Sequence, residues 1–169
     1  MSIEQRLRRL EDRAAINDLV VGYFLAADGD DLNGVGASFT DDATFSSSGV
    51  INASGRQGIV DFISGARDHM GLTIHTPHYA QLAFDGDDAA DGIVGAHLEL
   101  ALGENSVCAA VRYVDRYARV NDRWLISTRD MRTIYVAPWA DVGEAFASAS
   151  PVRWPGAAAT VSDFPRKKI

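Results

Sequence analysis

The sequence of 169 residues is short of cysteine, of long apolar runs and of positive charge. Its single cysteine, Cys108, cannot form a disulfide within the chain or supply a cysteine-based metal site. No apolar run approaches the roughly 18 residues of a membrane-spanning helix, so we expect no membrane partner. The net charge of −7 argues against nucleic acid as a main partner, because phosphate binding requires a basic surface.

The remaining composition is that of an ordinary globular domain. Hydrophobic residues make up 47% of the chain and charged residues 23%, and its length suits one domain with a sizeable core. The first residues, MSIEQRLRRLEDR, have a charged, helical pattern without the apolar region of a signal peptide. We therefore expect a cytoplasmic protein.

The stretch AAINDLVVGYFLAADGDD, residues 14–31, predicts a helix that ends at a carboxylate. Apolar residues recur at helical spacing, and Gly29 marks the end of the helix. Asp28 therefore lies in the last turn, where carbonyl oxygens and the negative end of the helix dipole repel a carboxylate. With Tyr23 on the same general side, Asp28 is either a surface accident or the polar end of a pocket.

Further helices are predicted before residue 72. Ser2 and Gln5 form a capping-box pattern that begins the first helix; one long helix and two helices with a kink both remain open. A short helix is expected over residues 31–39, followed by a strand and a polar loop or hairpin over residues 39–55. The apolar pattern of residues 59–66 predicts another helix, which ends near residues 70–71.

After Leu72 the pattern becomes that of strands. Four segments with clear turns between them are predicted, at residues 73–84, 89–102, 106–120 and 123–137. Short turns between long neighbouring strands imply antiparallel hairpins. Helices followed by a meander give an α+β fold, and strands of this length must twist and curl. A curled sheet with helices across its concave face leaves a cone-shaped cavity, where we expect a ligand.

Residues 139–169 are predicted to form a C-terminal extension of a domain at residues 1–138. The extension is rich in Ala, Ser and Pro, but it contains four aromatic residues that a disordered tail would rarely carry: Trp139, Phe146, Trp154 and Phe164. We expect an ordered segment that either covers the cavity or packs against a neighbouring subunit.

The histidines are the first candidates for chemistry. His75 and His78 share one predicted strand and lie on opposite faces by alternation, so one of them is expected to enter the cavity. His97 is expected to point away from the cavity, and His69 lies near a helix end, where positive charge is mildly favoured. Their spacing matches no metal-ligand motif, so we expect no metal.

Charged residues in the last two predicted strands are the second candidates. Arg112, Asp115 and Arg116 are interpreted as an exposed face. Arg129 lies between two apolar runs, and an arginine buried there would need a partner. Alternation leaves open whether Arg129 faces the cavity, because a bulge would change its phase.

The order of these segments resembles the SnoaL-like branch of the nuclear-transport-factor-2-like (NTF2-like) proteins. It is most similar to the group of scytalone dehydratase, bile-acid dehydratase and hexachlorocyclohexane dehydrochlorinase. The resemblance rests on RAAINDL, YFLAADGDD, FTDDATF, TIH and RYVDRYARVNDRWLISTRD, and covers about residues 4–137. It implies a cystatin-like cone, in which N-terminal helices pack on a strongly curved antiparallel sheet around an apolar cavity.

The resemblance also implies a set of site residues. The catalytic aspartate of the family falls on Asp28, the catalytic histidine on His75 and a pocket arginine on Arg129. A tyrosine of several dehydratases falls on Tyr23, while a second histidine of scytalone dehydratase has no clear counterpart here. The side chains expected to line the substrate pocket are Phe24, Phe45, Ala96, Leu98, Val111 and Tyr113.

These residue types suit proton abstraction without a cofactor. A carboxylate bonded to one ring nitrogen of His75 would fix its tautomer, so that the other nitrogen acts as a general base. Arg129 or Tyr23 would stabilise a departing group or an enolate. We therefore expect a dehydratase or dehydrohalogenase acting on a small apolar, cyclic molecule.

The sequence leaves open two alternative functions and the oligomeric state. The same pair would serve a ketosteroid-isomerase-like enzyme, and the same cone would serve a non-catalytic binder of small ligands. Relatives of this group are commonly trimers, so the resemblance implies a homo-oligomer, a trimer or else a dimer.

Overall fold

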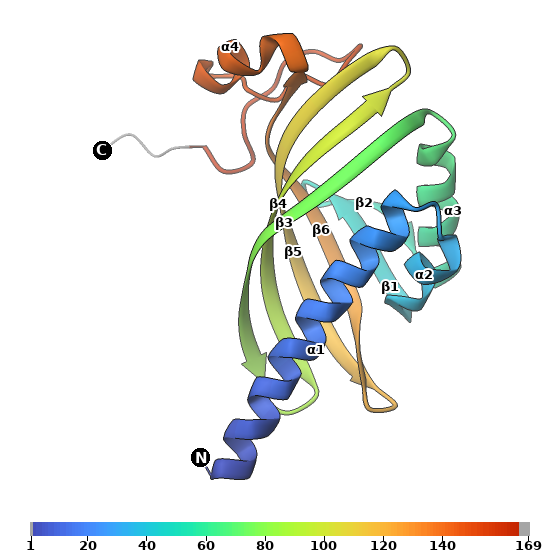
Figure 1. Ribbon diagram of the computed structural model, residues 1–169, viewed down its shortest axis with the longest axis vertical. Coiled ribbons are helices and arrows are strands. Elements are labelled where there is room, and N and C mark those ends of the chain that lie inside the picture. The colour runs from blue at the N-terminus through green and yellow to red at the C-terminus, as the bar shows by residue number, and fades with distance from the viewer. Residues whose placement is uncertain (1, 166–169) are drawn as a thin grey trace.

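The computed structural model describes residues 2–165 as helices followed by a curved sheet (Figure 1). The first elements are α1 (Ile3–Asp28), α2 (Leu32–Ala37), β1 (Phe39–Ser47), β2 (Val50–Ser54) and α3 (Arg56–Arg67). The long strands are β3 (Met70–Asp85), β4 (Ala89–Leu102), β5 (Asn105–Val120) and β6 (Arg123–Pro138). Two short helical segments follow, η1 (Trp139–Asp141) and α4 (Val142–Ala147). The α+β fold is as predicted.

Helix α1 is one continuous helix that crosses the concave side of the sheet (Figure 1). It begins with the predicted capping box, in which the Gln5 N–H donates to the Ser2 hydroxyl and the Ser2 N–H donates to the Gln5 side chain. It ends at Asp28, and the Gly29 N–H donates to the carbonyl of Leu25. Its buried side chains recur at helical spacing and face the sheet, so α1 is held by tertiary packing.

The sheet has six strands in the order β2-β1-β6-β5-β4-β3, with β2 and β3 at its edges. The four long strands form the predicted antiparallel meander, with bounds within a few residues of those expected. Contrary to the expectation of a wholly antiparallel sheet, β1 runs parallel to β6. This pairing joins strands far apart in the sequence, and a local hairpin pattern does not predict it. Helix α3 ends at Arg67, before the predicted residues 70–71, because Met70 already begins β3.

A bulge in β6 determines which way Arg129 points. In β6 the register shifts so that Ile126 pairs with Tyr117 and Thr128 pairs with Arg116, which leaves Ser127 unpaired. Alternation changes phase at this point, and Arg129 therefore faces the same interior as Ile126.

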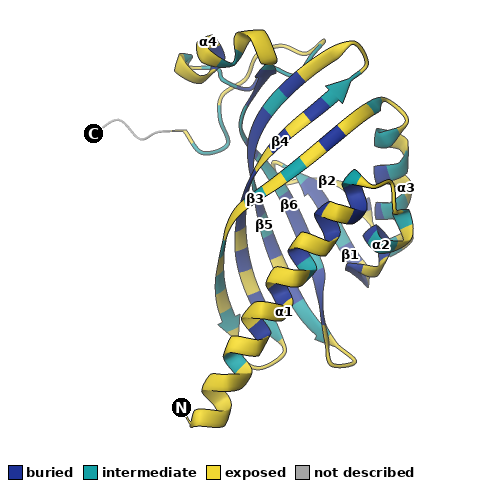
Figure 2. Cartoon of the chain, viewed as in Figure 1, coloured by how far each residue is buried: buried dark blue, intermediate teal, exposed yellow. Residues whose placement is uncertain are grey.

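The core lies between α1, α3 and the concave face of the sheet, and along β3 and β4 exposed residues alternate with less exposed ones (Figure 2). Large side chains from every layer are fully buried in it, among them Ile16, Phe39, Ile59, Val94 and Ile126. Within residues 2–165, no helix combines the length and apolar character that crossing a membrane requires.

The described part of the extension folds back against β6. Val152 forms bridges with Val136 and with Thr160, and the Asp163 carboxylate accepts from the Ser48 hydroxyl and from the Thr133 N–H, each at 2.7 Å. The extension therefore connects β6 with the β1–β2 turn. Residues 166–169 of the expected extension lie outside the described residues.

Candidate active site

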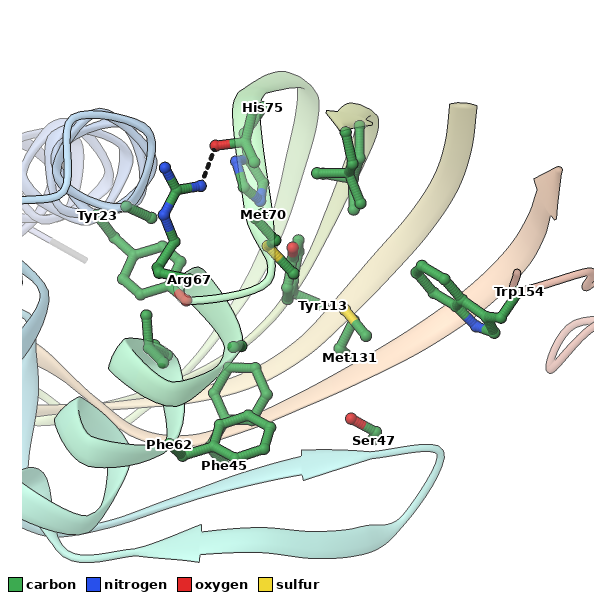
Figure 3. A pocket seen from close by; sticks show the side chains of 16 residues that line it. Tyr23, Phe45, Ser47, Phe62, Arg67, Met70, His75, Tyr113, Met131 and Trp154 are labelled. Atoms are coloured by element: carbon green, nitrogen blue, oxygen red, sulfur yellow. Dashed lines mark hydrogen bonds between the residues drawn. The ribbon is translucent and has the colours of Figure 1, made fainter. Parts of the chain in front are cut away.

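A cavity of about 180 Å³ opens between α1, α3 and the concave face of the sheet (Figure 3). Most of its wall is apolar and comes from elements distant in the sequence, including Phe45, Phe62, Ile63, Leu98, Leu100 and Met131. The polar groups at its wall belong chiefly to Tyr23, Ser47, Arg67, Thr73, His75 and Tyr113. Such a cavity suits a small apolar molecule with few polar contacts.

His75 lies at the wall of this cavity in contact with Asp28. Its Nδ1 is 2.6 Å from Asp28 Oδ1, and its backbone N–H donates to Asp28 Oδ2 at 2.8 Å. The ring of Phe24 stacks on the imidazole, with 5.0 Å between centroids and 11° between planes. No side chain of residues 2–165 hydrogen-bonds to Nε2, so this nitrogen is available to a molecule in the cavity.

Hydrogen bonds keep the Asp28 carboxylate ionised although its side chain is partly buried. Desolvation raises its pKa, but the ring and backbone N–H of His75 and the Thr73 hydroxyl together outweigh that effect and hold the pKa of Asp28 below its ordinary value. These donors also offset the repulsion at the end of α1. An ionised Asp28 fixes the proton of neutral His75 on Nδ1, which leaves Nε2 as a base.

Arg129 does not line the cavity. It is fully buried, and its Nε and Nη2 donate to the Asp115 carboxylate at 2.9 and 2.7 Å. Asp115 is only 3% exposed, so its interpretation as part of an exposed face is wrong. Arg116 beside it does lie on the convex surface, because successive residues of a strand face opposite sides.

The Arg129 guanidinium supports two rings of the cavity wall. It lies 4.4 Å from the ring centroid of Tyr23 and 4.7 Å from that of Tyr113. Burial raises the pKa of both tyrosines, against an opposing effect of the Arg129 charge. Both phenols are therefore neutral hydroxyls that can donate at the cavity wall.

The expected pocket residues divide into two groups. Phe45, Leu98 and Tyr113 lie at the cavity wall. The other three are buried in the core instead of lining it: Phe24, Ala96 and Val111. Phe24 is behind His75, while Ala96 and Val111 are cross-strand partners whose short side chains are covered.

Sequence reasoning missed most of the other wall residues, among them Arg67, Thr73 and Trp154. Thr73 precedes His75 by two residues on one strand, so alternation would have placed both on the same face. Arg67, in the last turn of α3, has the pattern of a surface residue and gave no such signal. Trp154 belongs to the extension, whose path the sequence does not specify.

The remaining histidines of β3 and β4 lie on the convex face. His78 and His97 are exposed, and His78 Nε2 is 2.8 Å from His97 Nδ1. The predicted division of His75 and His78 between two faces is thus observed. Among residues 2–165, no three His, Cys, Asp or Glu side chains are grouped so that they could hold a metal ion.

Comparisons with known proteins agree with this architecture. The SnoaL-like domain family matches residues 8–130. Gamma-hexachlorocyclohexane dehydrochlorinase of Sphingobium indicum is 30% identical over 139 residues, which cover 80% of this chain and 89% of that protein.

Solved structures are similar over a comparable share of the chain. The crystal structure of LinA superposes with a TM-score of 0.75 at 29% identity, covering 80% of this chain and 94% of that one. A scytalone dehydratase-like protein of Novosphingobium aromaticivorans gives a TM-score of 0.73 at 18% identity, covering 78% of this chain and 90% of that one. The second similarity concerns the fold alone.

The buried pair of Arg129 and Asp115 gives a prediction about stability. Asp115→Ala leaves an uncompensated charge in the core and should lower the free energy of unfolding by about 3–5 kcal/mol, measured by urea denaturation. Arg116→Ala, on the same strand but exposed, should change it little. Replacing both partners, with Asp115→Leu and Arg129→Met, should recover part of the loss; similar losses in all three variants would contradict this account.

The lowered pKa of Asp28 gives a prediction about pH. A carboxyl whose pKa falls on folding adds stability above its unfolded pKa of about 3.9, and that stability disappears as the pH falls through the folded value. The difference in unfolding free energy between the wild type and Asp28→Asn should therefore shrink from pH 5 to pH 2. Exposed Asp18→Asn is the control, and a difference for Asp28→Asn that is constant over this range would exclude the effect.

Proposed function

Because the chain belongs to the SnoaL-like domain family, we propose that it is a lyase of the dehydratase or dehydrohalogenase type that needs no cofactor. The observation that carries the proposal is the 2.6 Å contact between Asp28 and His75, with His75 Nε2 free at an apolar cavity. The relative from Sphingobium indicum is a dehydrochlorinase, which supports elimination over other reactions of the family.

In the proposed reaction, His75 Nε2 takes a proton from a carbon next to the one that bears the leaving group. The electron pair of the broken C–H bond forms the new C=C bond, and the bond to the leaving group breaks. A halogen departs as halide; a hydroxyl departs as water after it accepts a proton from the imidazolium or from a tyrosine hydroxyl. Asp28 holds the ring and stabilises the imidazolium while it exists.

The cavity supports a substrate about the size of a single six-membered ring. Its volume of about 180 Å³ is close to that of an apolar cavity that accommodates benzene, about 150 Å³. Tyr23 and Tyr113 supply neutral hydroxyl donors, and Arg129 holds their rings without reaching the substrate. Halogenated cyclohexanes and cyclic β-hydroxyketones are therefore the first compounds to screen.

The proposal predicts a selective loss of turnover in dyad variants. His75→Gln should lower kcat by about 10²–10⁴-fold on an accepted substrate, because it removes a positioned general base. Asp28→Asn should also lower kcat, because the ring loses its fixed tautomer. Initial rates with release of halide or formation of the alkene are the measurement.

His97→Ala is the matched control, since His97 lies on the convex face. Unchanged kcat in both His75→Gln and Asp28→Asn would refute the dyad. A product isomeric with the substrate, with no halide or water released, would favour the isomerase, and saturable binding without turnover would favour the ligand binder.

We also propose that the extension closes the mouth of the cavity. Its Trp154 lies at the cavity wall, and the contacts of Asp163 hold the segment against the β1–β2 turn and β6. The expected homo-oligomer stays a prediction, since a single chain is described.

Removal of the Trp154 ring should open the cavity to larger molecules. Trp154→Ala is expected to raise KM for a one-ring substrate several-fold and to admit two-ring analogues, because an aromatic contact and a steric limit are lost. Competition assays with analogues of increasing size measure this effect. Trp139→Ala, which removes an exposed Trp outside the cavity, is the control; equal effects of both variants would contradict the lid.

A further inference from the structure

The hydroxyl of Thr73 lies between a cation and the carboxylate of the dyad. It donates to Asp28 Oδ1 at 2.8 Å and accepts from Arg67 Nη1 at 2.7 Å, the bond that is dashed in Figure 3. Arg67 Nε in turn donates to Asp30 at 2.5 Å. Side chains from α3, β3 and the end of α1 thus form one series of hydrogen bonds that leads to His75.

The donor and acceptor capacity of these groups fixes the direction of each proton. A guanidinium only donates, so Arg67 must occupy a lone pair of the Thr73 oxygen. The single hydroxyl proton of Thr73 is then directed to Asp28. Two protons converge on Asp28 Oδ1, one from Thr73 and one from His75 Nδ1, while the His75 backbone N–H occupies Oδ2.

We propose that Arg67 and Thr73 are positioning residues, which hold the Asp28 carboxylate so that His75 keeps its proton on Nδ1 and presents a bare Nε2 to the cavity. Thr73 is buried, and the Arg67 guanidinium is held by Asp30 through Nε and by Thr73 through Nη1. The Arg67–Thr73 and Thr73–Asp28 bonds are therefore not mobile surface contacts. Without the Thr73 hydroxyl, the carboxylate loses a bond that fixes its rotation. The kinetic consequence rests on the proposed function, whereas the position of the ring proton is a property of the free protein.

The kinetic test compares Thr73→Val, which keeps the shape and removes the hydroxyl, with Thr73→Ser, which keeps the hydroxyl. With a hexachlorocyclohexane as probe, Thr73→Val should lower kcat about tenfold with KM within about twofold, the loss expected for one charge-assisted hydrogen bond. Thr73→Ser should stay near the wild type. Arg67→Met keeps the aliphatic stem and should lower kcat in the same way, and it replaces Thr73→Val if that variant does not fold.

The second test needs no turnover. Long-range ¹H–¹⁵N NMR spectra of the ¹⁵N-labelled full chain at pH 8 report which ring nitrogen is protonated, and His75→Gln identifies the His75 signals. We expect the Nδ1–H form in the wild type and in Thr73→Ser. A mixture with the Nε2–H form is expected in Thr73→Val and Arg67→Met.

The two tests separate this inference from the proposed function. If Thr73→Val and Arg67→Met keep the wild-type tautomer, the positioning role is overturned, whatever their kcat. If the tautomer shifts in these variants but His75→Gln retains turnover, the positioning role stands and the proposed lyase mechanism fails. A tautomer shift together with the tenfold fall in kcat supports both.

Discussion

A carboxylate at the negative end of a helix is the constraint on which the site depends. The dipole and last carbonyls of α1 disfavour Asp28, which is stable there because His75 and Thr73 direct donors at it. These donors come from β3, so the helix and the sheet must be packed before the carboxylate is satisfied. The same contacts that relieve the repulsion orient the imidazole. Stability and chemistry at this end of the cavity are therefore parts of one interaction.

The second charged site of the interior, the pair of Arg129 and Asp115, keeps its charges away from the cavity. Arg129 and Asp115 neutralise each other within the core, and the rings of Tyr23 and Tyr113 cover the guanidinium. The pair thus contributes shape to the cavity wall without exposing charge to it. The cavity wall is therefore mostly apolar, with neutral phenols and the His75 imidazole, and the Arg67 side chain at this wall is paired with Asp30 and Thr73.

Much of this arrangement could be predicted because it depends on local periodicity. The strand bounds, the opposite faces of His75 and His78 and the helix end at Asp28 follow from turns, alternation and a glycine. The choice of His75 as the histidine at the cavity comes from the family resemblance. The position of Arg129 does not follow from these patterns, because the bulge at Ser127 has no marker in the sequence and reverses the phase after it. The burial of Asp115, by contrast, follows from alternation along β5, which places it on the same face as Val111 and Tyr113. The parallel pairing of β1 with β6 depends on packing between distant segments.

Because β3 is an edge strand of the sheet, the contact of Asp28 with β3 also matters outside the cavity. An edge strand presents unpaired N–H groups, which can recruit strands of other molecules and lead to aggregation. In β3 the N–H of His75 is taken by the Asp28 carboxylate, and Pro77 has no N–H to offer. The end of α1 thus occupies one N–H group of this edge, so the segment that orients the imidazole also reduces what β3 offers to an added strand near His75.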